Sequence, residues 1–65
     1  MDIKSARIAA HMTQEELARA SSISRIALLR YENGQREPSV SVAAKIATAL
    51  GCSVDDLVNK KEDAE

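Results

Sequence analysis

The chain has 65 residues, 45% of them hydrophobic, and a formal net charge of −1. This length allows one small core, and the single cysteine, Cys52, excludes an internal disulfide. There is neither a run of about 18 apolar residues nor a secretory leader, so we expect a soluble cytoplasmic protein with no membrane partner.

Charge is unevenly distributed along the chain. Lysine and arginine outnumber aspartate and glutamate over the first fifty residues, whereas the chain ends in the acidic run "KKEDAE". We therefore expect a folded domain over residues 1–58 and an acidic, flexible tail over residues 59–65. A local basic patch is compatible with this distribution, but composition alone does not establish one.

Helix signals dominate the sequence, and the first two helices have clear caps. Asp2 can cap a first helix that runs through about Ala10. The run "TQEE" is a capping box, in which the Thr13 hydroxyl accepts from the Glu16 amide and the Glu16 carboxylate accepts from the Thr13 amide. It predicts a second helix over about residues 14–20.

Three more helices follow, each after a serine cap. The third starts at Ser24 and stops at "ENG", where Asn33 and Gly34 suit a left-handed turn. The fourth runs from Ser39 to Leu50, and a Ser53–Asp56 capping box starts a short fifth helix, "VDDLV". Five short helices predict a compact all-α domain. The link between the second and third is too short for a side-by-side hairpin, so these two helices should cross.

Several segments together resemble a known family. The stretch "TQEELARASSISRIALLRYENG", followed by "REPS" and "AKIATALGCSVDDLV", is similar to the Cro/cI-type (xenobiotic-response-element) helix-turn-helix family of prokaryotic and phage DNA-binding proteins. The resemblance extends from Ile3 to Val58. It implies a lambda-repressor-like fold of five helices, in which the second and third form the helix-turn-helix.

Two positions depart from the family pattern. The family often has glycine where His11 stands, and usually has glycine where Ser22 stands. If Ser22 takes a positive φ there, the backbone strain costs about 1 kcal/mol.

The third helix presents two different faces. At about 100° per residue, Leu28, Tyr31 and Glu32 share one side and should face the core, with Leu28 and Tyr31 as anchors. The opposite side should face solvent and carries Ile26, Leu29, Arg30 and Asn33, with Arg25 at its flank.

The resemblance implies that this outer face reads DNA bases in the major groove. The matching base-reading positions are Gln14, Arg25, Ile26 and Arg30, with Ser24 nearby. Arginine can donate two hydrogen bonds to guanine, and Ile26 and Leu29 can contact thymine methyl groups. We expect Arg25 and Arg30 to contribute most.

Other side chains are predicted to contact the DNA backbone. Thr13 and Gln14 lie at the start of the second helix, whose exposed amides suit a phosphate. Asn33, Gln35 and Arg36 lie where similar proteins touch the opposite strand. Such contacts position a protein on DNA without selecting a sequence.

Arg7 and Glu32 are charged residues on inward faces. Together they can form a partly buried ion pair that ties the first helix to the end of the third, and the family commonly has Arg and Glu at these two places.

A homodimer is expected, because one helix-turn-helix reads only a few base pairs and two copies about 34 Å apart reach useful specificity. Some apolar residues of the last two helices should stay outside the core and form the interface, with candidates Val42, Ile46, Val54, Leu57 and Val58.

The predicted function is a transcription regulator, either a repressor or a controller protein, that binds an inverted-repeat operator in double-stranded DNA. The alternatives are an antitoxin that also binds its own promoter, and a protein-interaction module that docks through Ile26 and Leu29. We expect that the protein is not an enzyme and that it binds neither a cofactor nor a small-molecule effector. His11 and Cys52 lack further ligands for a metal or an activating base, and adjacent acids such as Glu15 and Glu16 suit a first helical turn.

Overall fold

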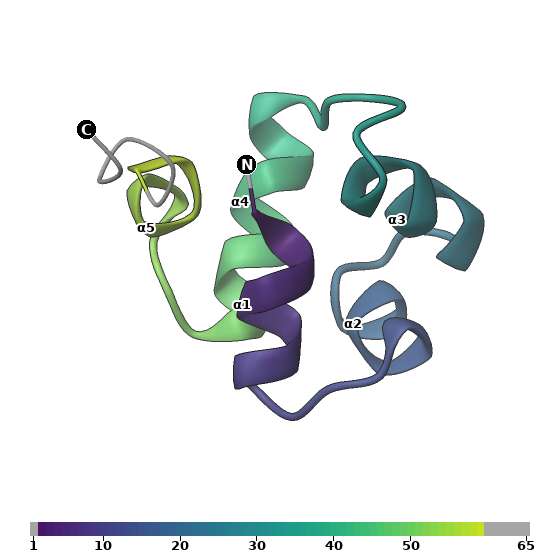
Figure 1. Cartoon of the computed structure of the whole chain (residues 1–65), viewed down its shortest axis with the longest axis horizontal. Coiled ribbons are helices and arrows are strands. Elements are labelled where there is room, and N and C mark those ends of the chain that lie inside the picture. Colours follow the sequence, from purple (N-terminus) through teal and green to yellow (C-terminus); the bar gives the residue numbers. More distant parts are fainter. Residues whose placement is uncertain (1, 60–65) are drawn as a thin grey trace.

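The computed structural model describes residues 2–59, and these residues form five helices (Figure 1). They are α1 (Ile3–Ala9), α2 (Gln14–Ala20), α3 (Arg25–Glu32), α4 (Val40–Leu50) and α5 (Val54–Asn59). The all-α fold of five helices predicted from the sequence is confirmed. The tail predicted for residues 59–65 lies outside the described residues, except for Asn59, which is the last residue of α5.

Side-chain caps fix where the helices begin. The capping box before α2 is complete: the Thr13 hydroxyl accepts from the Glu16 amide at 3.0 Å, and the Glu16 carboxylate accepts from the Thr13 amide at 2.8 Å. A second complete box joins Ser53 and Asp56 before α5. The predicted caps of the other helices are also confirmed, namely Asp2, Ser24 and Ser39.

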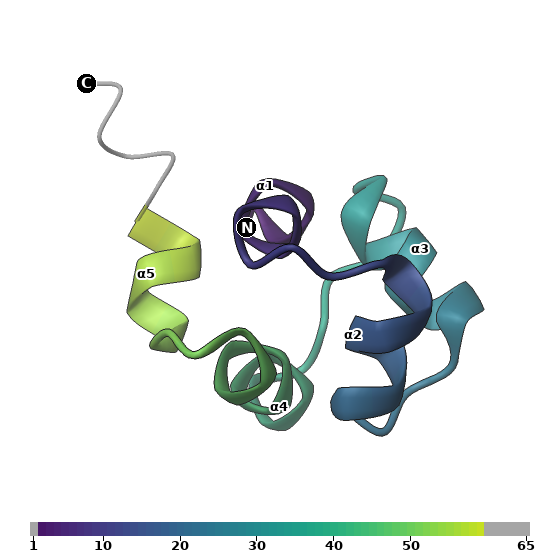
Figure 2. The ribbon, with the colours of Figure 1, turned by 90° about the horizontal axis from the view of Figure 1, so that it is seen from below.

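The helices are arranged in three groups along the longest axis of the molecule. Two views at right angles show α1 and α4 in the middle, α2 and α3 together on one side, and α5 on the opposite side (Figures 1 and 2). This arrangement places α3 and α5 at opposite ends.

Each helix contributes one large, fully buried side chain to a single core. These side chains are Ile3, Leu17, Leu28, Ile46 and Leu57. Tyr31 and Val42 are half-buried and pack against this core. Ile46 and Leu57 were candidates for a dimer interface. Only some of the five candidates were expected outside the core, and these two are not among them, since both side chains close the core and expose at most 1% of their surface.

Two turns contain non-glycine residues in the left-handed region. His11, between α1 and α2, and Ser22, between α2 and α3, both have φ of 60°. The resemblance raised this conformation for Ser22 only as a condition, and the structure has it. At the end of α3, only Gly34 is left-handed, with φ of 77°, whereas Asn33 stays near the helical region at φ of −86°. The left-handed turn predicted there thus requires the glycine alone.

Replacing Ser22 with glycine is expected to raise the free energy of unfolding by about 0.5–1 kcal/mol. Glycine removes left-handed strain of roughly 1–2 kcal/mol but gives the unfolded chain about 0.5–1 kcal/mol more conformational freedom. The Tm should rise by about 2–8 °C in thermal unfolding followed by circular dichroism. Gly51→Ser is the reverse control, because Gly51 has φ of 77° and an added Cβ would meet no atom within 4 Å. An unchanged Tm for Ser22→Gly would show that the turn is not strained.

Ser21, at the end of α2, has a buried hydroxyl. Its side chain is 1% exposed, and its Oγ has no hydrogen-bond partner among the described residues. Ser21→Ala is expected to stabilise the domain by about 1 kcal/mol, because it removes a polar group whose burial is not compensated. Urea unfolding measures this change. The control is Ser41→Ala on the exposed side of α4, where the hydroxyl is solvated and the gain should be smaller.

Candidate nucleic-acid interface

The unit formed by α2, the turn at residues 21–24 and α3 presents one face of α3 to solvent. Leu28 is fully buried and anchors the helix, whereas Ile26 is 64% and Leu29 is 38% exposed. Arg25 and Arg30 are exposed beside them. Neither arginine forms an ion pair or a side-chain hydrogen bond within residues 2–59. This face therefore offers two unpaired guanidinium groups and two apolar side chains.

The two cap residues next to this face keep hydrogen-bonding capacity. The Ser24 hydroxyl accepts from the Ala27 amide at 3.0 Å, and the Thr13 hydroxyl accepts from the Glu16 amide at 3.0 Å. Acceptance uses a lone pair of the oxygen, so each hydroxyl hydrogen remains free to donate. Both residues are exposed and could donate to a DNA oxygen.

Arg7 and Glu32 form an ion pair inside the molecule. Arg7 Nε donates to Glu32 Oε2 at 2.7 Å, and Arg7 Nη2 donates to Oε1 at 3.4 Å. The third contact of the guanidinium is the backbone carbonyl of Met12, at 2.9 Å from Nη1. Only 12% of the Arg7 side chain and 1% of the Glu32 side chain are exposed. The pair thus joins α1, the loop before α2 and the last turn of α3.

Gln14, the first residue of α2, contacts this ion pair. Its Nε2 donates to Glu32 Oε1 at 3.1 Å. The sequence predicted Gln14 as a base-reading residue, and no sequence signal indicated that it would bind Glu32. The two residues are eighteen positions apart, and a periodicity analysis reports only on neighbours within one helix.

A hollow of about 580 Å³ lies at the start of α2. It is lined by Arg7, Met12, Thr13, Gln14, Glu15 and Arg25. The hollow brings together two predicted base readers, Gln14 and Arg25, and the predicted backbone contact Thr13. The sequence placed Thr13 and Gln14 at the start of the second helix and Arg25 on the third, and the fold makes Arg25 a neighbour of the other two.

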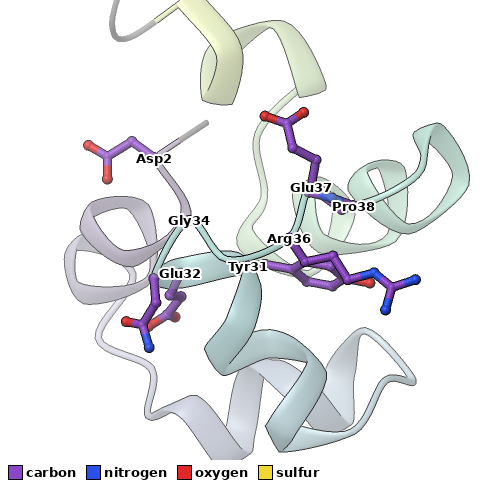
Figure 3. A pocket seen from close by; sticks show the side chains of 8 residues that line it. Asp2, Tyr31, Glu32, Gly34, Arg36, Glu37 and Pro38 are labelled. Carbon is purple, nitrogen blue, oxygen red and sulfur yellow. The ribbon is translucent and has the colours of Figure 1, made fainter.

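Residues predicted to contact the DNA backbone follow the end of α3. Asn33, Gln35 and Arg36 are all exposed. Asn33 and Arg36 line a second hollow, of about 360 Å³, together with Asp2 at the start of α1 (Figure 3). Asp2, Glu32 and Glu37 also line this hollow, so acidic groups outnumber the Arg36 guanidinium there. Because of this mixed charge, the hollow is not a favourable site for a phosphate group.

Comparison with known proteins gives the family. A family model described as helix-turn-helix matches residues 3–57. The chain belongs to the helix-turn-helix family. This assignment confirms the Cro/cI-type resemblance, and α2 and α3 are the two helices of the motif.

Relatives and a solved structure agree with this assignment. This helix-turn-helix chain is 34% identical over 53 residues to an uncharacterized HTH-type transcriptional regulator of Methanocaldococcus jannaschii, covering 82% of the chain and 80% of the relative. It is 45% identical over 49 residues to the HTH-type regulator YqaF of Bacillus subtilis, covering 75% and 64%. The crystal structure of the clp gene regulator ClgR from C. glutamicum matches with a TM-score of 0.87 at 34% identity, covering 95% of the chain and 80% of ClgR.

Apolar residues outside the core of this helix-turn-helix domain are candidates for protein contacts. Val42 and Val54 are half-buried, and the side chain of Val58 lies outside what the structure describes. Ile8 and Val40 are largely exposed, and neither was predicted to be. The exposure of Ile8 could have been predicted from helical periodicity, because Ile8 does not lie on the helical face that carries Ile3 and Ala10.

Two other classes of feature are absent within residues 2–59. No helix there is both long and apolar enough to cross a membrane. The same residues hold no group of three or more histidine, cysteine, aspartate or glutamate side chains that could bind a metal ion.

Proposed function

We propose that the protein is a transcription regulator that binds an inverted-repeat DNA operator as a homodimer, with α3 in the major groove. The observation that carries this proposal is the face formed by Arg25, Ile26, Leu29 and Arg30, which is exposed and unpaired on a helix anchored by Leu28. Membership of the helix-turn-helix family and relatives named as transcriptional regulators support DNA-binding transcription regulation.

The chemistry of this face suits base edges. A guanidinium can donate two hydrogen bonds to O6 and N7 of guanine, and we assign this role to Arg25 and Arg30. Ile26 and Leu29 would pack on thymine methyl groups, which are the apolar features of the major groove. Ser24, at the entrance of α3, would donate its free hydroxyl hydrogen to a nearby base or phosphate.

Contacts to phosphate would flank this face on both sides. Thr13 lies at the start of α2, and Asn33, Gln35 and Arg36 lie beyond the end of α3. Such contacts hold a domain in register on the duplex and are independent of base sequence. The protein would act as a repressor wherever its operator overlaps a promoter.

The dimer would form away from α3. Figures 1 and 2 place α5 at the end of the molecule opposite α2 and α3. An interface around Val54 and Val42 would leave both copies of α3 free to enter successive major grooves. Analytical ultracentrifugation of the protein on a palindromic site tests this part, and a single copy per site would exclude it.

The experiment that tests the function is selection of bound fragments from a random DNA pool, followed by affinity measurement at several salt concentrations. A dimer that contacts about six or more phosphates should lose roughly 10³-fold in affinity between 50 and 200 mM salt. The exposure of Ile26 and Leu29 favours one other function, docking of a protein on α3. Apolar docking would show no steep salt dependence and no selected DNA sequence.

Arg30→Ala and Asn33→Ala should weaken binding in different ways. Loss of the Arg30 guanidinium is expected to cost about 1–3 kcal/mol at one base position, so preference there relaxes. Loss of the Asn33 amide should weaken binding to all sequences alike, because phosphate contacts carry no base information. Repeating the selection with each variant measures both effects, and the reverse pattern would contradict the assignment.

A further inference from the structure

Both carboxylate oxygens of Glu32 accept from Arg7, and one of them also accepts from Gln14. Oε2 accepts from Arg7 Nε at 2.7 Å, whereas Oε1 accepts from Arg7 Nη2 at 3.4 Å and from Gln14 Nε2 at 3.1 Å. With 1% of the Glu32 side chain exposed, water does not compete for these bonds. The buried carboxylate therefore holds one end of the Gln14 amide, and Arg7 holds the carboxylate.

This contact fixes which way the Gln14 amide points. An amide group has a nitrogen end that donates and an oxygen end that only accepts. If the amide turned over, Gln14 Oε1 would face Glu32 Oε1, and two acceptor oxygens would repel. The negative charge of Glu32 thus selects the orientation with Nε2 inward.

The groups that remain on Gln14 are an acceptor and one donor. Oε1 has no hydrogen-bond partner within the described residues, and Nε2 has a second hydrogen. Gln14 lines the open hollow that it shares with Thr13 and Arg25, on the surface proposed to face DNA. An acceptor and a donor side by side match the major-groove edge of adenine, which presents N6–H and N7.

We propose that Glu32 is a positioning residue for base recognition, which orients Gln14 to read adenine. This inference rests on the proposed function, since it requires α2 and α3 to lie on the major groove. Guanine presents two acceptors there and would face Gln14 Oε1 with O6. Glu32 would in this way favour adenine over guanine, although it is buried and does not itself contact DNA.

Selection of bound DNA by the wild type, Gln14→Ala and Glu32→Gln tests the proposal. The wild type should select adenine at one position of each half-site, and Gln14→Ala should lose that preference by about tenfold. Glu32→Gln should lose adenine preference at the same position, because a neutral amide can pair with either end of Gln14. The preferences assigned to Arg25 and Arg30 should persist.

A matched control separates positioning from stability. Ile46→Val removes one methylene from the core in α4, a helix that carries neither Gln14 nor Glu32, and should cost roughly 0.5–1.5 kcal/mol. This variant should keep the adenine preference. If Glu32→Gln weakened binding to all sequences equally, as a purely structural change would, the positioning role would be excluded.

A measurement on the wild type does not depend on a folded Glu32 variant. Nuclear magnetic resonance of the Gln14 side-chain amide should show one hydrogen protected from exchange in the free protein, and both hydrogens protected on selected DNA, where the second one donates to adenine N7. Two equally exchanging hydrogens in the free protein would overturn the proposal. Uniform weakening of binding by Gln14→Ala would also overturn it, because Gln14 would then be a phosphate contact, while the proposed DNA-binding function would stand. Absence of any selected sequence for the wild type would instead refute the proposed function and this inference together.

Discussion

Replacing Arg7 with methionine is expected to destabilise the domain by about 3–5 kcal/mol, the largest effect of any single substitution considered for this chain. The variant leaves the Glu32 carboxylate charged and buried, with only the Gln14 amide as a partner. When one member of a buried ion pair is removed, the desolvation cost of burying the remaining charge is no longer offset. The Met12 carbonyl also loses its donor. A domain of this size has only about 3–5 kcal/mol of stability in total, so most molecules should be unfolded at 25 °C.

Urea unfolding followed by circular dichroism measures this loss. The double variant Arg7→Met, Glu32→Leu is the control, because removing both charges also removes the desolvation cost, and such replacements are often neutral or stabilising. We expect the double variant to recover most of the stability. If Arg7→Met alone unfolded at the same urea concentration as the wild type, the ion pair would contribute nothing to the fold.

Leu28→Ala is expected to cost about 2–5 kcal/mol, because Leu28 is the fully buried side chain through which α3 joins the core. Its truncation leaves a cavity shared by α3 and its neighbours. The outer face of α3 should then lose its fixed position, and DNA binding should fail along with stability. Thermal unfolding and DNA affinity, measured on the same sample, report the two effects.

The neighbouring residue provides the matched control. Leu29→Ala removes the same side-chain atoms from the exposed face of α3. Its effect on stability should be small, and its effect on DNA should be confined to the preference for thymine at one position. Equal losses of stability for the two variants would mean that the inner and outer faces of α3 have been assigned wrongly.

The sequence predicted the helices well because their starts depend on local chemistry. Thr13 with Glu16, and Ser53 with Asp56, satisfy backbone groups only three residues away, so the pattern is visible in the chain itself. The inner position of Leu28 likewise follows from a helical period within one element.

Contacts between helices were harder to predict. The sequence did not reveal that Gln14 binds Glu32, because that contact depends on how α2 meets the end of α3. Ile46 and Leu57 were candidates for an interface because periodicity cannot distinguish a side chain that faces the core from one that faces a partner. In a domain where each helix supplies one large core residue, that distinction requires the three-dimensional arrangement.

The left-handed turns at His11 and Ser22 bear on how long the protein persists in a cell. Each kilocalorie per mole of strain raises the unfolded fraction about fivefold, and proteases degrade that fraction. We therefore expect Ser22→Gly to extend the half-life of the protein in a pulse-chase experiment. For a DNA-binding regulator, whose occupancy of DNA depends on its concentration, these two turn residues would influence how long the DNA stays occupied once synthesis of the protein stops.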